Sequence, residues 1–64
     1  MKCIVKMLVE IDVLDDPAAR KKFREVAADL TDTVEGQGIV RELKLIEDRS
    51  GRLIDRWEEK GNVQ

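Results

Sequence analysis

The side chains able to do chemistry in this chain are few. The sequence has 64 residues, no histidine, no tyrosine and a single cysteine, Cys3. A tetrahedral zinc site of the usual kind draws on histidine or on several cysteines, so we expect none here. Cys3 has no imidazole to activate its thiol, and its place in an alternating apolar run predicts a buried packing residue. We therefore expect no metal site, no cofactor and no cysteine nucleophile.

One carboxylate stands out as a weak catalytic candidate. Asp55 falls between Leu53 and Trp57, on what should be the core-facing side of a strand. A charged residue at such a position belongs either to a strand end or to an ion pair. Arg41 is also odd-numbered, so it would lie on the same face of the sheet and is the candidate partner. Because burial and a nearby charge both perturb a pKa, Asp55 is the one residue to which we assign possible acid–base chemistry.

The elements that must position these residues begin with an alternating segment. Residues 3–13 predict a half-buried strand, because every odd position is apolar and several even ones are charged. Ile4 and Leu8 interrupt the polar side, so the second face of the sheet should not be fully solvated. The apolar odd positions are Cys3, Val5, Met7, Val9, Ile11 and Val13.

A helix is predicted from about 17 to 35. Asp15 and Asp16 precede Pro17, which suits the first helical position, and we expect Asp16 to be the N-cap rather than half of a catalytic carboxylate pair. Gly36 and Gly38 supply a residue for the left-handed conformation that commonly ends a helix. The apolar stripe recurs at steps of three and four through Ala19, Phe23, Val26, Ala27, Leu30 and Val34.

Two further strands are expected to form a hairpin. The "DRSG" sequence fits a three-residue loop, 49–51, with glycine in a G1 bulge. This loop sets a register in which opposite residue numbers sum to 100, placing Leu43 opposite Trp57 and Ile46 opposite Ile54. A two-residue loop would oppose apolar to charged residues, so we prefer the longer one. Trp57 is then explained as core, with a subunit interface or ring stacking as alternatives.

These elements predict an α+β fold of β-α-β-β type. One helix would cover one face of a three-stranded sheet of order 1-3-2, half of a ferredoxin-like fold, in a single domain of residues 1–60 with a frayed tail at 61–64. The second sheet face would then be left without a cover. We expect it to be an interface, and its apolar residues are Ile4, Leu8, Val40, Ile46 and Ile54.

Size and charge narrow the classes of function. A chain this short buries only about 60% of its unfolded surface, and with disulfides and metal set aside, self-association is the remaining source of stability. The 12 basic and 14 acidic residues nearly cancel, which argues against non-specific nucleic-acid binding. Lys2, Lys6 and Glu10 interrupt the N-terminal apolar run, so we expect no signal peptide, no membrane association and a cytoplasmic protein.

The order of elements resembles two known families. The "VKMLVEIDV" strand, the "DPAA" helix start and the "GIVRELKLIEDRSGRLIDRWE" hairpin are similar to the first half of the muconolactone isomerase-like proteins. That resemblance implies a ferredoxin-like fold and association through sheets. The layout is also similar to tautomerase subunits, whose chemistry needs an N-terminal proline. Lys2 occupies that place here, so we expect that chemistry to be absent.

Cations at the start of the predicted helix run against its dipole. Arg20 and Arg24 share one flank of the apolar stripe, near the positive end, where acidic residues would be favoured. Either they form an ordinary solvated face, or they meet an acidic group on a partner or another subunit. From the sequence we expect a cytoplasmic homo-oligomeric binding module rather than an enzyme; the alternative is a small isomerase-type enzyme with a pocket formed between subunits.

Overall fold

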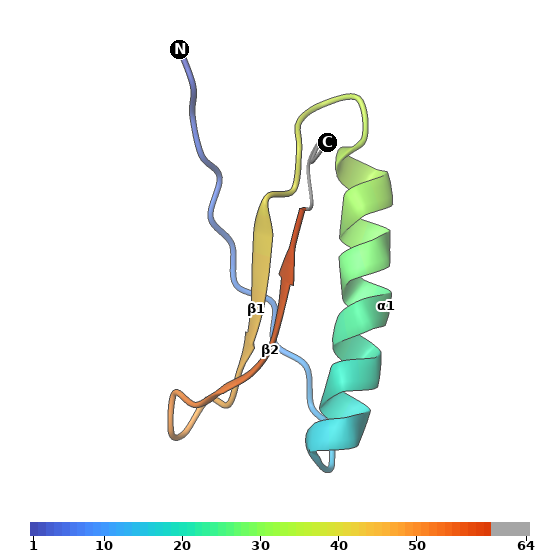
Figure 1. The fold of residues 1–64 in the computed structure, drawn as a ribbon, viewed down its shortest axis with the longest axis vertical. Coiled ribbons are helices and arrows are strands. Elements are labelled where there is room, and N and C mark those ends of the chain that lie inside the picture. Colours follow the sequence, from blue (N-terminus) through green and yellow to red (C-terminus); the bar gives the residue numbers. More distant parts are fainter. Residues whose placement is uncertain (60–64) are drawn as a thin grey trace.

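The computed structural model describes residues 1–59 and has one helix followed by one hairpin (Figure 1). Helix α1 spans Asp16–Val34, strand β1 spans Glu42–Ile46 and strand β2 spans Leu53–Glu58. The two strands pair antiparallel in a two-stranded sheet, and α1 packs along it. The α+β class is confirmed, but the predicted three-stranded sheet of order 1-3-2 is wrong. The predicted frayed tail, 61–64, lies outside the described residues.

The missing strand is the N-terminal one. Residues 1–13 run as an extended segment from the N-terminus to the start of α1, beside the hairpin but without strand pairing (Figure 1). The alternation of apolar and polar residues reflects side chains that point to opposite sides of an extended backbone. An extended backbone has this alternation whether or not a neighbouring strand pairs with it. The pattern therefore predicted the local conformation, while pairing depends on a second strand that this arrangement does not bring into register.

Helix α1 begins one residue earlier than expected. Asp15 is the N-cap, with extended backbone angles, and its Oδ1 accepts a hydrogen bond of 2.9 Å from the backbone N–H of Ala18. Asp16 is instead already helical, which frees its carboxylate for a partner elsewhere in the fold. At the other end Gly36 has φ 85°, as predicted for the residue that ends the helix.

The hairpin reaches the expected register by a different route. The N–H of Gly51 donates to the carbonyl of Glu47, and the N–H of Glu47 donates to the carbonyl of Arg52, so the loop has four residues, 48–51, rather than three. A bulge between Leu45 and Ile46 compensates for the extra residue. Beyond it, opposite residue numbers sum to 100 as predicted.

The bulge changes which side chains face the helix. Leu43 lies opposite Trp57, which is confirmed, whereas Ile46 lies opposite Leu53 and not opposite Ile54. Ile54 is the extra residue of the bulge, and it packs against the core under α1. Its predicted place on the uncovered face is therefore wrong, because one extra residue in a strand reverses the alternation of faces.

The core is small. Among residues 1–59 the buried apolar side chains are those of Ala19, Phe23, Ala27 and Leu45. The predicted helical stripe is buried at Ala19, Phe23 and Ala27 and half-buried at its other positions. The partly buried residues packed against the core cluster are Ile11, Leu43, Ile54 and Trp57. Within residues 1–59 the two most buried side chains, at 3% and 4% exposure, are the alanines Ala19 and Ala27, so the core buries little apolar surface.

Candidate functional site

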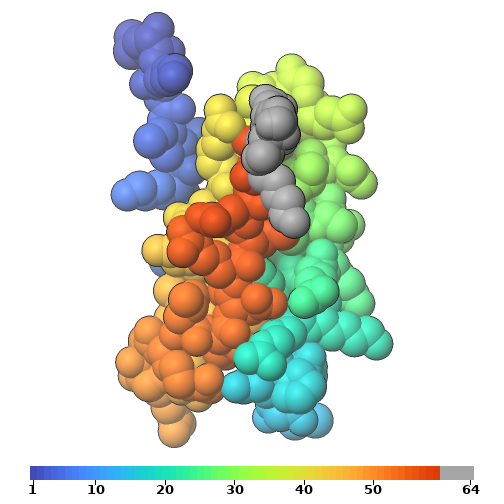
Figure 2. Space-filling model, in the orientation of Figure 1, coloured from blue at the N-terminus to red at the C-terminus, as the bar shows by residue number. Residues whose placement is uncertain are grey.

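Among residues 1–59, most of the exposed large apolar side chains lie in the N-terminal segment, which we define as residues 3–13. Leu8 is 99% exposed, Ile4 and Val5 are each 85% exposed, and Met7 and Val9 are more than half exposed. In the space-filling view its first residues project away from the body formed by the helix and the hairpin (Figure 2). Such an extended apolar run leaves surface for another chain to cover.

The backbone of the N-terminal segment is as open as its side chains. Within residues 1–59, no backbone hydrogen bond joins residues 1–13 to the helix or the hairpin. An extended segment whose N–H and C=O groups lack partners on both sides is a template for strand pairing. Ile4 and Leu8 are thus exposed as predicted, but on a free segment instead of on a sheet face.

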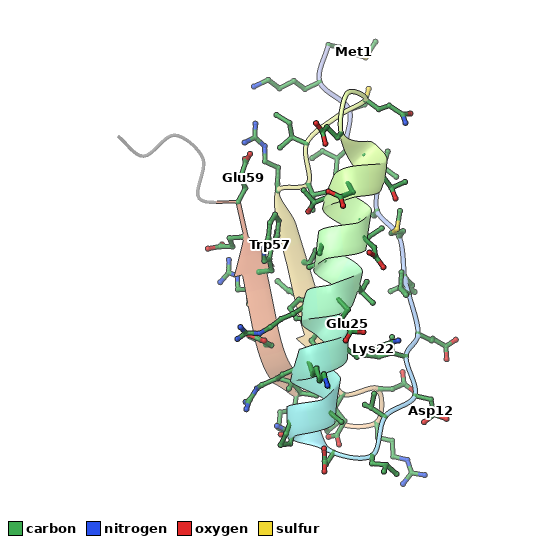
Figure 3. All side chains as sticks on the ribbon, turned by 90° about the vertical axis from the view of Figure 1, so that its right-hand side faces the viewer. Met1, Asp12, Lys22, Glu25, Trp57 and Glu59 are labelled. Carbon is green, nitrogen blue, oxygen red and sulfur yellow. The ribbon has the colours of Figure 1, made fainter. Side chains whose placement is uncertain are left out.

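Ile11 anchors the end of the N-terminal segment next to the helix. It is half-buried and packs against the cluster formed by Ala19, Phe23 and Leu45. Because Ile11 is an odd-numbered residue, the odd side of the segment faces the core at this end. Figure 3 shows the segment running from Met1 to Asp12 towards the start of α1, and in Figure 1 most of it lies on the β1 side of the hairpin.

The outer face of the hairpin is charged where the sequence predicted an apolar surface. Arg56 Nη2 donates to Glu42 at 2.7 Å and also pairs with Glu58, so charged side chains cover this face at the end near the chain terminus. Ile46 and Leu53, each about half exposed, form an apolar pair at the loop end. Leu53 was missed because its face depends on the bulge.

The five predicted interface residues are therefore not gathered in one patch. Ile54 packs inward, Val40 is half-buried, and Ile46 sits on the outer face of the hairpin. Ile4 and Leu8 belong to the N-terminal segment. The predicted three-stranded sheet, which would have placed these five residues on one face, does not form.

A shallow groove runs between the second half of α1 and β2. Its cavity of about 410 Å³ adjoins a second of about 310 Å³, and Thr31 and Trp57 line both. Trp57 is half-buried, so one part of its indole packs on the core while another forms the groove wall (Figure 3). The remaining residues around the larger cavity are Arg24, Ala27, Ala28 and Asp32.

The two helix arginines have different surroundings. Arg20 Nη2 donates to the backbone carbonyl of Ile54 at 3.4 Å, so this side chain contacts the outer edge of β2. Arg24 lines the groove beside Trp57. Both are exposed. Arg20 therefore has a contact within the chain that the sequence did not indicate, because the contact depends on the bulge at Ile54.

The catalytic candidates do not form a constellation. Asp55 is half-buried, and its Oδ1 accepts a hydrogen bond from the backbone N–H of Arg56 at 2.8 Å. Arg41, its expected partner, instead pairs with Glu59 across the strands. Cys3 is exposed, so its predicted burial is wrong. Within residues 1–59, no three metal-ligating side chains gather in one place.

One titratable pair is organised by the fold. Arg52 binds the carboxylate of Asp16 through two hydrogen bonds, which join the hairpin loop to the start of α1. The hydrogen bond from Arg52 lowers the pKa of Asp16; partial burial opposes the shift, and the charges of Arg52 and Arg20 reinforce it. The same bond raises the pKa of the Arg52 guanidinium. Neither residue of this pair lines the groove.

Helix α1 is amphipathic and charged, and no helix within residues 1–59 is long and apolar enough to cross a membrane. A comparison of the chain with models of protein families, with curated proteins and with solved structures gives no match.

Proposed function

We propose that this chain is a small cytoplasmic interaction module that functions as a homo-oligomer. The observation that carries the proposal is the N-terminal segment, an extended apolar run with exposed side chains and an unpaired backbone. The small core under α1 supports it, since a two-stranded sheet with one helix is at the lower limit of what is stable alone. Association would cover the segment and add to that core.

Light scattering coupled to size-exclusion chromatography tests this proposal. We expect the wild-type chain to have at least twice the mass of one copy, and Leu8→Glu to shift it towards the monomer. A matched control is Ile39→Glu, which puts the same charge on an exposed apolar residue in the connection after α1. A wild-type monomer of ordinary stability would contradict the proposal, as would equal effects of the two substitutions.

A second surface is proposed at Arg20 and Arg24. Both guanidinium groups are exposed near the N-terminal half of α1, where the dipole disfavours them, so an acidic group of a partner or subunit would offset that cost. Arg24 is the better placed, because Arg20 already contacts the carbonyl of Ile54. Replacing Arg24 by Glu should weaken such binding more at low salt than at high salt.

The groove beside Trp57 favours an alternative function. A cavity of about 410 Å³ with an aromatic wall and an arginine suits a small carboxylate-bearing ring compound, and the resemblance to the muconolactone isomerase-like group points to the same class. Trp57 is the single tryptophan, so its fluorescence reports directly on the groove. Saturable quenching by an unsaturated lactone acid, lost in Arg24→Ala, would favour this alternative over the interaction module.

A further inference from the structure

We propose that two copies of this chain pair through their N-terminal segments, antiparallel, with Leu8 on the two-fold axis. This inference rests on the proposed self-association and adds which segment pairs, with what and in which register. The occupant of the exposed segment is thus the same segment of a second copy. Three properties of the described residues carry it: charge complementarity, the match of apolar positions, and continuity with the core.

Charge complementarity supports the register centred on Leu8. In an antiparallel pair centred on Leu8, opposite residue numbers sum to 16, so Lys6 of each copy lies opposite Glu10 of the other. The two-fold axis makes this contact twice. Opposite charges directly across a strand pair stabilise it, while like charges destabilise it. Leu8, which is 99% exposed in the single chain, then lies against its own equivalent.

The apolar positions match in the same register. Val5 lies opposite Ile11, Met7 opposite Val9, and Cys3 opposite Val13. The unfavourable contacts between Ile4 and Asp12 fall near the ends of the ribbon, where strands fray most easily. Centring the pair on Val9 would also oppose charges, Lys6 to Asp12, but it would put Leu8 against Glu10 on both sides of the axis, in the middle of the ribbon. Centring it on Met7 would put Lys6 against Leu8, so Leu8 is the preferred centre.

The paired ribbon would extend both cores. Ile11 already packs against Ala19, Phe23 and Leu45, which shows that the odd side of the segment faces inward at that end. In the proposed register Val5 of the second copy lies beside Ile11, so its odd side continues the same apolar surface. Each copy therefore supplies side chains to the small core of the other. Such a contact, the same patch on both copies, is how a two-fold dimer closes.

Disulfide trapping tests the register. In a Cys3→Ser background, Leu8→Cys places a thiol on the axis, so oxidised glutathione should link two full-length copies efficiently. Ile4→Cys in the same background is the control, because it replaces another highly exposed apolar residue on the same side of the segment. It should give little dimer, since its equivalent lies eight residues along the strand, roughly 27 Å away.

The wild-type thiol distinguishes antiparallel from parallel pairing. Cys3 lies opposite Val13 in the antiparallel ribbon, roughly 33 Å from the other Cys3, and should resist cross-linking. A parallel in-register pair would bring the two Cys3 thiols together. Efficient linkage of the wild-type chain, or equal linkage of the two engineered thiols, would therefore overturn the proposed register.

Charge exchange tests the pairing without a new thiol. Lys6→Glu alone or Glu10→Lys alone should each weaken dimerisation by about ten-fold, because both cross-strand pairs become repulsive. An equimolar mixture of the two variants should dimerise like the wild type, since the mixed dimer has opposite charges at both positions. The double variant should also recover. Absence of recovery in the mixture would overturn the inference.

The outcomes separate the two proposals. A monomeric wild type by light scattering would remove both the proposed function and this inference. A wild-type dimer in which Leu8→Cys does not link and the charge exchange has no effect would leave the interaction module intact. The N-terminal segment would then associate with another part of the second copy, such as an open hairpin edge, and the pairing of the two N-terminal segments would be rejected.

Discussion

Arg52 and Asp16 lie 36 residues apart in the sequence and are joined by two parallel hydrogen bonds of 3.1 Å. A guanidinium facing a carboxylate in this way makes the most directional ion pair available to side chains. It fastens the loop end of the hairpin to the first turn of α1. Because Asp15 caps the helix, Asp16 is free to make this contact.

The stability of the fold should depend on the protonation of Asp16. Its folded-state pKa lies below the ordinary value of 3.8, so as pH falls the unfolded chain takes up the proton first. The contribution of the pair is complete above 3.8 and is lost as pH falls through the lowered pKa. Urea midpoints at fixed protein concentration, measured from neutral pH downward, should show the wild type and Asp16→Asn converging in acid. A difference in urea midpoint between the two proteins that stays constant with pH would contradict the lowered pKa of Asp16.

Removing the helix cap should cost stability independently of that pair. Asp15→Ala leaves the backbone N–H of Ala18 without its acceptor, and loss of such a cap typically costs about 0.5–2 kcal/mol. Asp12→Ala is the control, since Asp12 is an exposed carboxylate in the same stretch of chain. Thermal unfolding followed by circular dichroism measures both. Equal midpoints for the two variants would show that the cap does not contribute.

Phe23 should be the most sensitive core position. It is 7% exposed at the centre of the contact between α1 and the hairpin, and truncation of a buried phenylalanine to alanine costs about 3–5 kcal/mol. A domain of this size has a comparable total stability, so Phe23→Ala should largely unfold it. Leu53→Ala, at a half-exposed position, should change the midpoint little. A folded Phe23→Ala with a midpoint near wild type would contradict the packing described.

The two glycines after α1 should respond differently to alanine. Gly36 has φ 85°, and nothing lies within 4 Å of an added Cβ, so Gly36→Ala is opposed by backbone conformation alone. A cost of about 1 kcal/mol is expected for a non-glycine residue in this region. Gly38 has no positive φ, and its Cβ would sit 3.7 Å from Val34 Cγ1, an ordinary contact. Gly38→Ala should therefore be neutral or stabilising in the same unfolding measurement.

Much of the local structure follows from the sequence. The helix, predicted over about 17–35 and observed over Asp16–Val34, its glycine stop and the opposition of Leu43 to Trp57 were predictable, because each depends on neighbours along the chain or on one hairpin. Capping by an aspartate before Pro17 was also predictable, although the residue was displaced by one. Such errors are small because the N-cap and the first helical position both favour acidic side chains.

The faces of the hairpin depended on tertiary structure. A four-residue loop and a bulge give nearly the same register as a three-residue loop, but they turn Ile54 towards α1 and Leu53 away from it. The turn sequence alone does not discriminate between the two, and the bulge places Ile54 against the cluster under α1, a contact between distant parts of the chain. The contact of Arg20 with the carbonyl of Ile54 follows from the same choice.

The N-terminal segment shows most clearly what the sequence alone does not determine. The alternation from Cys3 to Val13 determined an extended chain with one apolar side, which is a property of the segment by itself. Whether it pairs depends on a second strand, and pairing between distant parts of a chain requires closing a long loop before any contact is gained. In this fold only Ile11 reaches the core, so tertiary structure left the rest of the segment exposed.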